Sequence, residues 1–154
     1  SWDTSQVTNM NSVLSTALVF NQAVGAWDLG QVTDTRCMFC KASLYNQPMG
    51  TWSTGEVTSM AHMFNEAGSL NQELNGWSTG KVETMEMMFR RAYAFNQPLS
   101  SWRVSKVVNT RYMFYDAASF NGLMDGWNAS QVCKQRHSAG SSTRTSYSSP
   151  YAHV

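Results

Sequence analysis

Apolar residues recur along this chain with a period of 25 residues. The same point of each period is always tryptophan, and a valine follows each tryptophan five residues later. No insertion or deletion interrupts the spacing of Trp2, Trp27, Trp52, Trp77, Trp102 and Trp127. A repeat of this length is typical of proteins built from stacked units, each packing mainly on its neighbours.

Within each unit, apolar residues at i, i+3, i+4 and i+7 predict a short helix. In the third unit this pattern comprises Met60, Met63, Phe64 and Ala67, and Ser59 precedes it as a candidate helix cap. The equivalent capping positions elsewhere are Asn9, Asp34, Thr84 and Asn109. A helix of about two turns is unstable alone, so we expect packing between units to stabilise it.

An asparagine follows the helical pattern in every full unit. We expect it to be buried, with its amide bonded to the backbone of its own unit and the next. The residues between it and the next tryptophan alternate loosely, which predicts a short extended segment. The expected structural ladder comprises Asn21, Asn46, Asn71, Asn96 and Asn121 together with Trp27, Trp52, Trp77 and Trp102.

The repeat divides the chain in two. Residues 1–133 hold five full units and a partial sixth, and we expect them to form one solenoid. Residues 134–154 are rich in serine and threonine and basic, and we expect this tail to be flexible unless a partner binds it. The chain begins inside a unit without methionine, so we interpret it as a piece of a longer protein.

Composition excludes several classes of function. The 11 basic and 10 acidic side chains nearly balance, which argues against a general affinity for nucleic acid or anionic lipid. No apolar run approaches the ~20 residues of a transmembrane helix. The three histidines have no ligand spacing, and we find neither a glycine-rich phosphate loop nor a nucleophile–base arrangement. We therefore expect no cofactor, no metal and no enzymatic activity.

Residues 57–67 (VTSMAHMFNEA) and 70–74 (LNQEL), followed by Trp77, resemble the repeat of the BspA-like leucine-rich-repeat surface proteins, above all their DUF285 branch. The resemblance covers residues 2 to about 132. It departs from the pattern at several places, for example where Val13 and Leu14 replace Met-Phe. It implies an α/β fold, an LRR-like right-handed solenoid in which each unit has a short extended segment and a short helix. It also implies surface or secreted display and binding rather than catalysis.

The positions that vary between units lie on the outer face of the predicted helices. Arginine and tyrosine, which often anchor protein interfaces, are frequent there. We predict a protein-binding surface at this face, and the alternative is an ordinary solvated face. The candidate partner-binding residues are Arg36, Lys41, Arg90, Arg91, Arg111, Tyr112 and Tyr115.

These features predict a non-catalytic module for protein–protein interaction or cell-surface adhesion, located extracellularly or at the cell surface. The alternative is a small structural subunit of a large assembly, such as a peripheral subunit of an organellar membrane complex in an alga. A third interpretation is that the tryptophans form an aromatic ladder that binds a glycan.

Two further motifs have more than one interpretation. Cys37 and Cys40 form a C-x-x-C on the outer face of a predicted helix, where free thiols, a local disulfide, or a metal or catalytic site are alternatives. Asn128 begins an N-glycosylation sequon that would be used only in a secreted chain.

Overall fold

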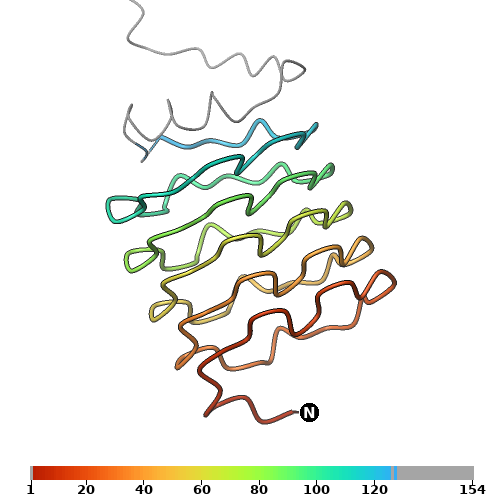
Figure 1. The fold of residues 1–154 in the computed structure, drawn as a ribbon, viewed down its shortest axis with the longest axis vertical. Helices are drawn as coiled ribbons and strands as arrows, with labels where there is room; N and C mark the ends of the chain where they lie inside the picture. Colours follow the sequence, from red (N-terminus) through yellow and green to blue (C-terminus); the bar gives the residue numbers. More distant parts are fainter. Residues whose placement is uncertain (1, 126, 128–154) are drawn as a thin grey trace, which may run out of the picture.

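A computed structural model describes residues 2–125 and 127 of the chain. Figure 1 shows a stack of similar coils that follow one another in sequence order, with the N-terminus at one end. Four isolated parallel β-bridges join consecutive coils, linking Asn9, Asp34, Ser59, Thr84 and Asn109 in that order. Each 25-residue period therefore forms one coil, in register with the next.

The prediction of an α/β fold with a short helix and an extended segment in each unit is wrong. Residues 2–125 and 127 contain no helix and no strand longer than an isolated bridge. In an α-helix, each N–H donates to the carbonyl four residues earlier. Here alternate N–H groups donate instead to the next coil, while those between them close turns with the residue three positions earlier. In the third coil, the N–H groups of His62, Phe64 and Glu66 donate to the carbonyls of Glu86, Met88 and Arg90 at 2.7, 2.9 and 2.7 Å.

Left-handed backbone conformations replace the helix. Two non-glycine residues in each coil have φ between 51° and 63°. Each such residue costs roughly 1–2 kcal/mol, because its β-carbon crowds the carbonyl oxygen. The hydrogen bonds between coils offset this cost. The residues are Ser12, Thr16, Cys37, Lys41, His62, Glu66, Met87, Arg91, Tyr112 and Asp116.

The apolar pattern nevertheless identifies the interior. Met60, Met63, Phe64 and Ala67 are all fully buried, although no helix presents them. Their equivalents stack coil upon coil, and the ring of Phe64 lies 5.6 Å from that of Phe39, centroid to centroid. A run of alternating turns therefore buries the same spacing of side chains that a helix would bury.

Three of the five candidate capping residues stabilise turns rather than helices. The side-chain oxygens of Asn9, Asp34 and Asn109 accept hydrogen bonds from the N–H two residues later, at 2.8, 2.9 and 3.0 Å. Such local bonds favour a turn over a helix. The same residues form the β-bridges, so each one fixes both the turn and the register between coils.

The tryptophans connect coils through the interior. Trp52, Trp77 and Trp102 are buried, and each indole Nε1 donates to the backbone carbonyl 28 residues earlier, at 2.9–3.2 Å. Adjacent rings stack, with centroids 5.9 Å apart for the first pair and 6.4 Å for the second. The half-buried Trp27 stacks on the exposed Trp2. Trp127 is buried as well, and its indole donates to the carbonyl of Leu99 at 3.2 Å. These buried rings offer no open face to a sugar.

The asparagines form a ladder at the surface. Asn21, Asn46, Asn71 and Asn96 each accept, through Oδ1, the backbone N–H of the next asparagine at 2.8–3.0 Å. The side chains of Gln47, Gln72 and Gln97 also donate to this ladder. Their Nε2 atoms bond to Oδ1 of Asn21, Asn46 and Asn71, respectively. Our expectation that these asparagines are buried is wrong, because four of the five are exposed and Asn46 is partly so.

Some predictions fall outside the described residues. They are the boundary at residue 133, the tail at 134–154 and the sequon at Asn128. Among the residues that the structure does describe, no helix could cross a membrane.

Candidate functional site

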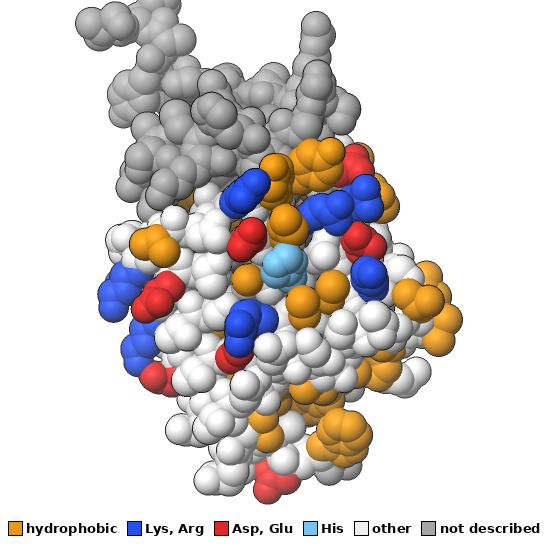
Figure 2. Space-filling view, viewed as in Figure 1, with side chains coloured by type: hydrophobic (Ala, Val, Ile, Leu, Met, Phe, Trp, Pro, Cys, Tyr) orange, Lys and Arg blue, Asp and Glu red, His pale blue; other side chains and the backbone are white. Residues whose placement is uncertain are grey.

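A row of alternating charge runs across the coils. Lys41, Glu66, Arg91 and Asp116 occupy the same position in successive coils, and all four have left-handed backbone conformations. Arg91 lies between two carboxylates, with its Nη1 3.5 Å from Glu66 and its Nε 3.6 Å from Asp116. Figure 2 shows basic and acidic side chains interspersed on this face of the molecule. We call these four residues the charge row.

Two arginines and two tyrosines lie beside Arg91 of the charge row, on its own and the next coil. Arg90 donates to Glu66 at 2.9 Å, and its guanidinium lies 5.8 Å from the ring centroid of Tyr115. The guanidinium of Arg111 lies 4.8 Å from the ring centroid of Tyr112, whose ring meets that of Tyr115 edge to face at 5.7 Å. We call Arg90, Arg91, Arg111, Tyr112 and Tyr115 the Arg–Tyr cluster.

The charges of this region are balanced and held in place. Arg111 donates a hydrogen bond to the Tyr112 hydroxyl at 3.4 Å, and this bond, with the nearby Glu86, raises the pKa of Arg111. The three arginines of the cluster are matched by Glu66, Glu86 and Asp116. The region therefore has strong local charge and little net charge, which does not suit a phosphate backbone.

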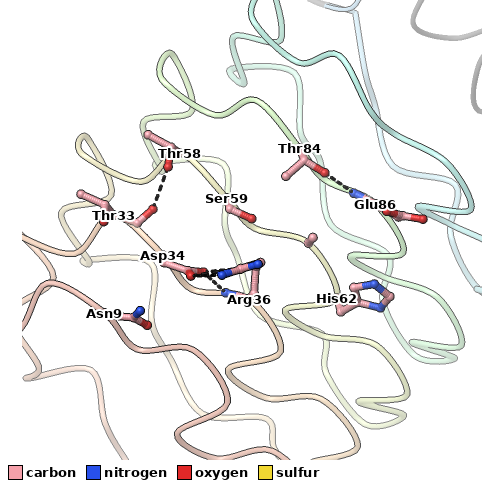
Figure 3. A pocket seen from close by; sticks show the side chains of 10 residues that line it. Asn9, Thr33, Asp34, Arg36, Thr58, Ser59, His62, Thr84 and Glu86 are labelled. Carbon is pink, nitrogen blue, oxygen red and sulfur yellow. Dashed lines mark hydrogen bonds and ion pairs between the residues drawn. The ribbon is translucent and has the colours of Figure 1, made fainter.

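A shallow hollow of about 670 Å³ adjoins the cluster. Figure 3 shows its polar lining, with Arg36, His62 and Glu86 around the opening. Ala61 lies in the hollow because it is the one small residue in its register row, between Arg36 one coil before and Glu86 one coil after. The lining residues are Asn9, Thr33, Asp34, Arg36, Thr58, Ser59, Ala61, His62, Thr84 and Glu86.

Two features fix the chemistry of this hollow. Arg36 pairs with Asp34 through Nε and Nη2, at 2.7–3.0 Å, and this pairing lowers the pKa of the Asp34 carboxyl. Glu86 accepts a hydrogen bond from the Asn109 side chain at 3.1 Å, and it also lies close enough to influence Arg111. Glu86 therefore links the hollow to Arg111 of the cluster. Together with the charge row, the hollow and the cluster form one surface, which we call the polar face.

The structure brings five of the seven predicted partner-binding residues together in the Arg–Tyr cluster. Arg36 lies apart from them, in the hollow, and Lys41 lies at the N-terminal end of the charge row. The hollow was missed by the sequence analysis. Aligning the units would have revealed it, because one register position holds a single small side chain, Ala61, among larger ones. The residues at this position are Asn11, Arg36, Ala61, Glu86 and Arg111.

The two cysteines of the C-x-x-C are free thiols. Cys40 is buried rather than on an outer face, and its Sγ accepts a weak hydrogen bond from Asn65 at 3.7 Å. Burial and the neighbouring Cys40 raise the pKa of Cys37 to about 11, so this thiol is protonated at neutral pH. Among the described residues, no group of three or more histidine, cysteine or acidic side chains could hold a metal ion.

Comparison with known proteins identifies a family. The model of the family described as "Mycoplasma protein of unknown function, DUF285" matches residues 1–57 and 46–148. No curated protein and no solved structure matches the chain. The broader assignment to BspA-like leucine-rich-repeat proteins stays a prediction. Because the two matches together cover most of its length, the chain belongs to the DUF285 family.

Proposed function

We propose that this chain is a non-catalytic module that binds a protein partner through the polar face, and that it is displayed outside the cell or at its surface. The observation that supports the proposal most strongly is the Arg–Tyr cluster. It gathers, on adjacent coils, the residue types that dominate the binding energy of protein interfaces.

The cluster suits binding because its side chains are already held in place. Arg90 is only 22% exposed and pairs with Glu66, and the two tyrosine rings support each other edge to face. A free arginine loses roughly 0.5–1.5 kcal/mol of conformational entropy when a partner immobilises it. Side chains that are ordered before contact lose less, so more of their interaction energy contributes to affinity.

The charge row favours selectivity. A partner would need charges of alternating sign in the opposite order, spaced by one coil. Juxtaposed like charges disfavour other proteins. Since the net charge of the region is small, we expect contacts to depend on matched pairs rather than on long-range attraction.

A small structural subunit of a large assembly, such as a peripheral subunit of an organellar membrane complex, is a second candidate. In both cases the partner is a protein.

Capture from an extract of the source organism tests the proposal. The immobilised wild-type chain is compared with Arg91→Glu, which would place an acidic residue between Glu66 and Asp116. The matched control is Arg103→Glu, the same charge change at an exposed position half a coil away. We expect one protein to be retained by the wild type and the control and lost from Arg91→Glu. Equal capture by all three chains would refute the polar face as the binding site.

A further inference from the structure

The hollow of the polar face contains a carboxylate that no basic side chain of the described residues pairs with. Glu86 lines the hollow and accepts a hydrogen bond from the Asn109 side chain at 3.1 Å. It forms no ion pair with any described residue. The other carboxylates of this face, Asp34, Glu66 and Asp116, are each paired with an arginine, at 2.7, 2.9 and 3.6 Å. Glu86 is therefore the carboxylate that a cation from outside the chain can still use.

Arg111 is the nearest candidate within the chain, and it is engaged elsewhere. Its guanidinium lies 4.8 Å from the ring centroid of Tyr112 and donates to the hydroxyl of that residue at 3.4 Å. The Tyr112 hydrogen bond is the main cause of the raised pKa of Arg111, and the charge of Glu86 contributes less to it. The side chain of Arg111 is exposed, so solvent screens its attraction to Glu86.

The charges that line the hollow favour a cation over an anion. Arg36 donates to both carboxylate oxygens of Asp34 at 2.7–3.0 Å, so these two charges offset each other. With one arginine, two carboxylates and a neutral His62, the lining has a net charge of −1. A phosphate or sulfate would be repelled by two carboxylates there, whereas a cation would be attracted by one that is unpaired.

The hollow lies where one side chain is short in a row of long ones. Ala61 occupies a register position that holds Arg36 in the preceding coil and Glu86 in the following one. The resulting space of about 670 Å³ is lined by both of these side chains (Figure 3). Because the hollow is shallow, a small molecule would remain largely in water. A side chain that belongs to a larger partner would be held there by contacts outside the hollow as well.

We propose that the hollow receives a lysine or arginine side chain of a protein partner, whose ammonium or guanidinium group pairs with Glu86. The inference rests on the proposed function, because it assigns one contact at the polar face. Glu86 is only partly exposed, so salt would screen this ion pair less than a pair of fully exposed side chains. The hydroxyl oxygens of Thr58 and Thr84 line the same hollow and can accept further N–H groups of the incoming side chain.

Blocked single amino acids are the probes, because they have the side-chain charge without charged termini. Nα-acetyl-arginine amide and Nα-acetyl-lysine amide are titrated into the isotope-labelled full chain, and the backbone amide shifts are followed by two-dimensional NMR. The uncharged Nα-acetyl-citrulline amide is the control for side-chain shape. We expect saturable shifts at Ala61, His62 and Glu86, with citrulline amide binding at least about tenfold more weakly. Absence of saturable shifts with both basic amides, or equal binding of citrulline amide, would overturn the inference.

Two variants locate the binding of these amides. Glu86→Gln removes the charge and keeps the side-chain length, and it should weaken binding at least about tenfold. Ala61→Gln fills the hollow and should weaken binding similarly, and the coil should tolerate it because adjacent coils hold long side chains at this register position. Glu73→Gln is the matched control, since it removes an exposed carboxylate that does not line the hollow. Binding that both Glu86→Gln and Ala61→Gln leave intact would contradict the inference.

Capture from an extract separates this inference from the proposed function. We expect the protein that the wild-type chain retains to be retained by Glu73→Gln and lost from Glu86→Gln and Ala61→Gln. If Arg91→Glu loses that protein while Glu86→Gln and Ala61→Gln both retain it, the inference fails and the proposed function stands. Equal capture by all of these chains, Arg91→Glu included, would refute the proposed function and the inference with it.

Discussion

The clearest test of the backbone structure compares glycine with alanine at His62. This residue lies in the middle of the predicted third helix, yet its φ is 60°. Replacing alanine by glycine there removes only the β-carbon. In the left-handed conformation the β-carbon costs roughly 1–2 kcal/mol, while glycine loses roughly 0.5–1 kcal/mol more conformational entropy on folding. We therefore expect His62→Gly to be more stable than His62→Ala by about 0.7 kcal/mol.

The neighbouring Ala61 provides a matched control, because its φ is negative and its methyl group is buried. Ala61→Gly should destabilise the chain by about 1–2 kcal/mol, through the entropy of glycine and the loss of a buried methyl. The free energy of unfolding is measured by urea titration followed by tryptophan fluorescence. In a helix, glycine would be less stable than alanine at both positions, by about 1 kcal/mol. Loss of stability in His62→Gly relative to His62→Ala would therefore refute the coil structure.

Three further measurements test other parts of the structure. Asn71→Ala should destabilise the chain by about 0.5–1.5 kcal/mol in urea titration, because it removes the acceptor of two hydrogen bonds. Water can partly replace that acceptor, since the site is exposed. A loss well above that range would mean that the asparagine ladder is buried. Trp102→Phe should lower the free energy of unfolding by about 2–4 kcal/mol, because it removes the indole hydrogen bond and leaves a cavity. Trp2→Phe should lower it by almost nothing, because Trp2 is exposed. Equal losses in the two variants would contradict the difference in burial between these residues. Alkylation of Cys37, followed by peptide mapping, should have its midpoint near pH 11 rather than 9.0, since burial raises its pKa to about 11. The free energy of unfolding should also fall as the pH rises from 9.0 to about 11, because the thiol loses its proton at a lower pH in the unfolded chain than in the folded one. An alkylation midpoint at or below pH 9 would rule out a buried thiol.

The sequence was sufficient to predict the period and the interior. The tryptophan spacing gave the repeat, and the apolar positions predicted as a helix face are the ones that lie inside. The helix itself could not be tested from this pattern, because side-chain spacing reports which residues face inward and not where the N–H groups donate. The left-handed positions carry no sequence signal either, since they hold serine, cysteine, histidine, methionine and tyrosine rather than glycine.

The candidate site was only partly predictable for a similar reason. Variation between units identified Arg90, Arg91 and Arg111, which the structure brings together. The hollow depends on a small side chain between two large ones in consecutive coils, so it becomes visible only when units are compared row by row. The surface position of Asn71 was missed because an amide that satisfies backbone groups can do so at an exposed edge as well as in a core.

The most direct test of the proposed binding role is cross-linking of the native protein through its lysines, with the linked peptides identified by mass spectrometry. Lys41 belongs to the charge row, whereas Lys81 and Lys106 occupy a different position of the coil, and all three are exposed. We expect reproducible links from Lys41 to one other protein, with few from the other two lysines. A chain that forms links only within itself, or that contacts its partner through Lys81 and Lys106 alone, would contradict binding at the polar face.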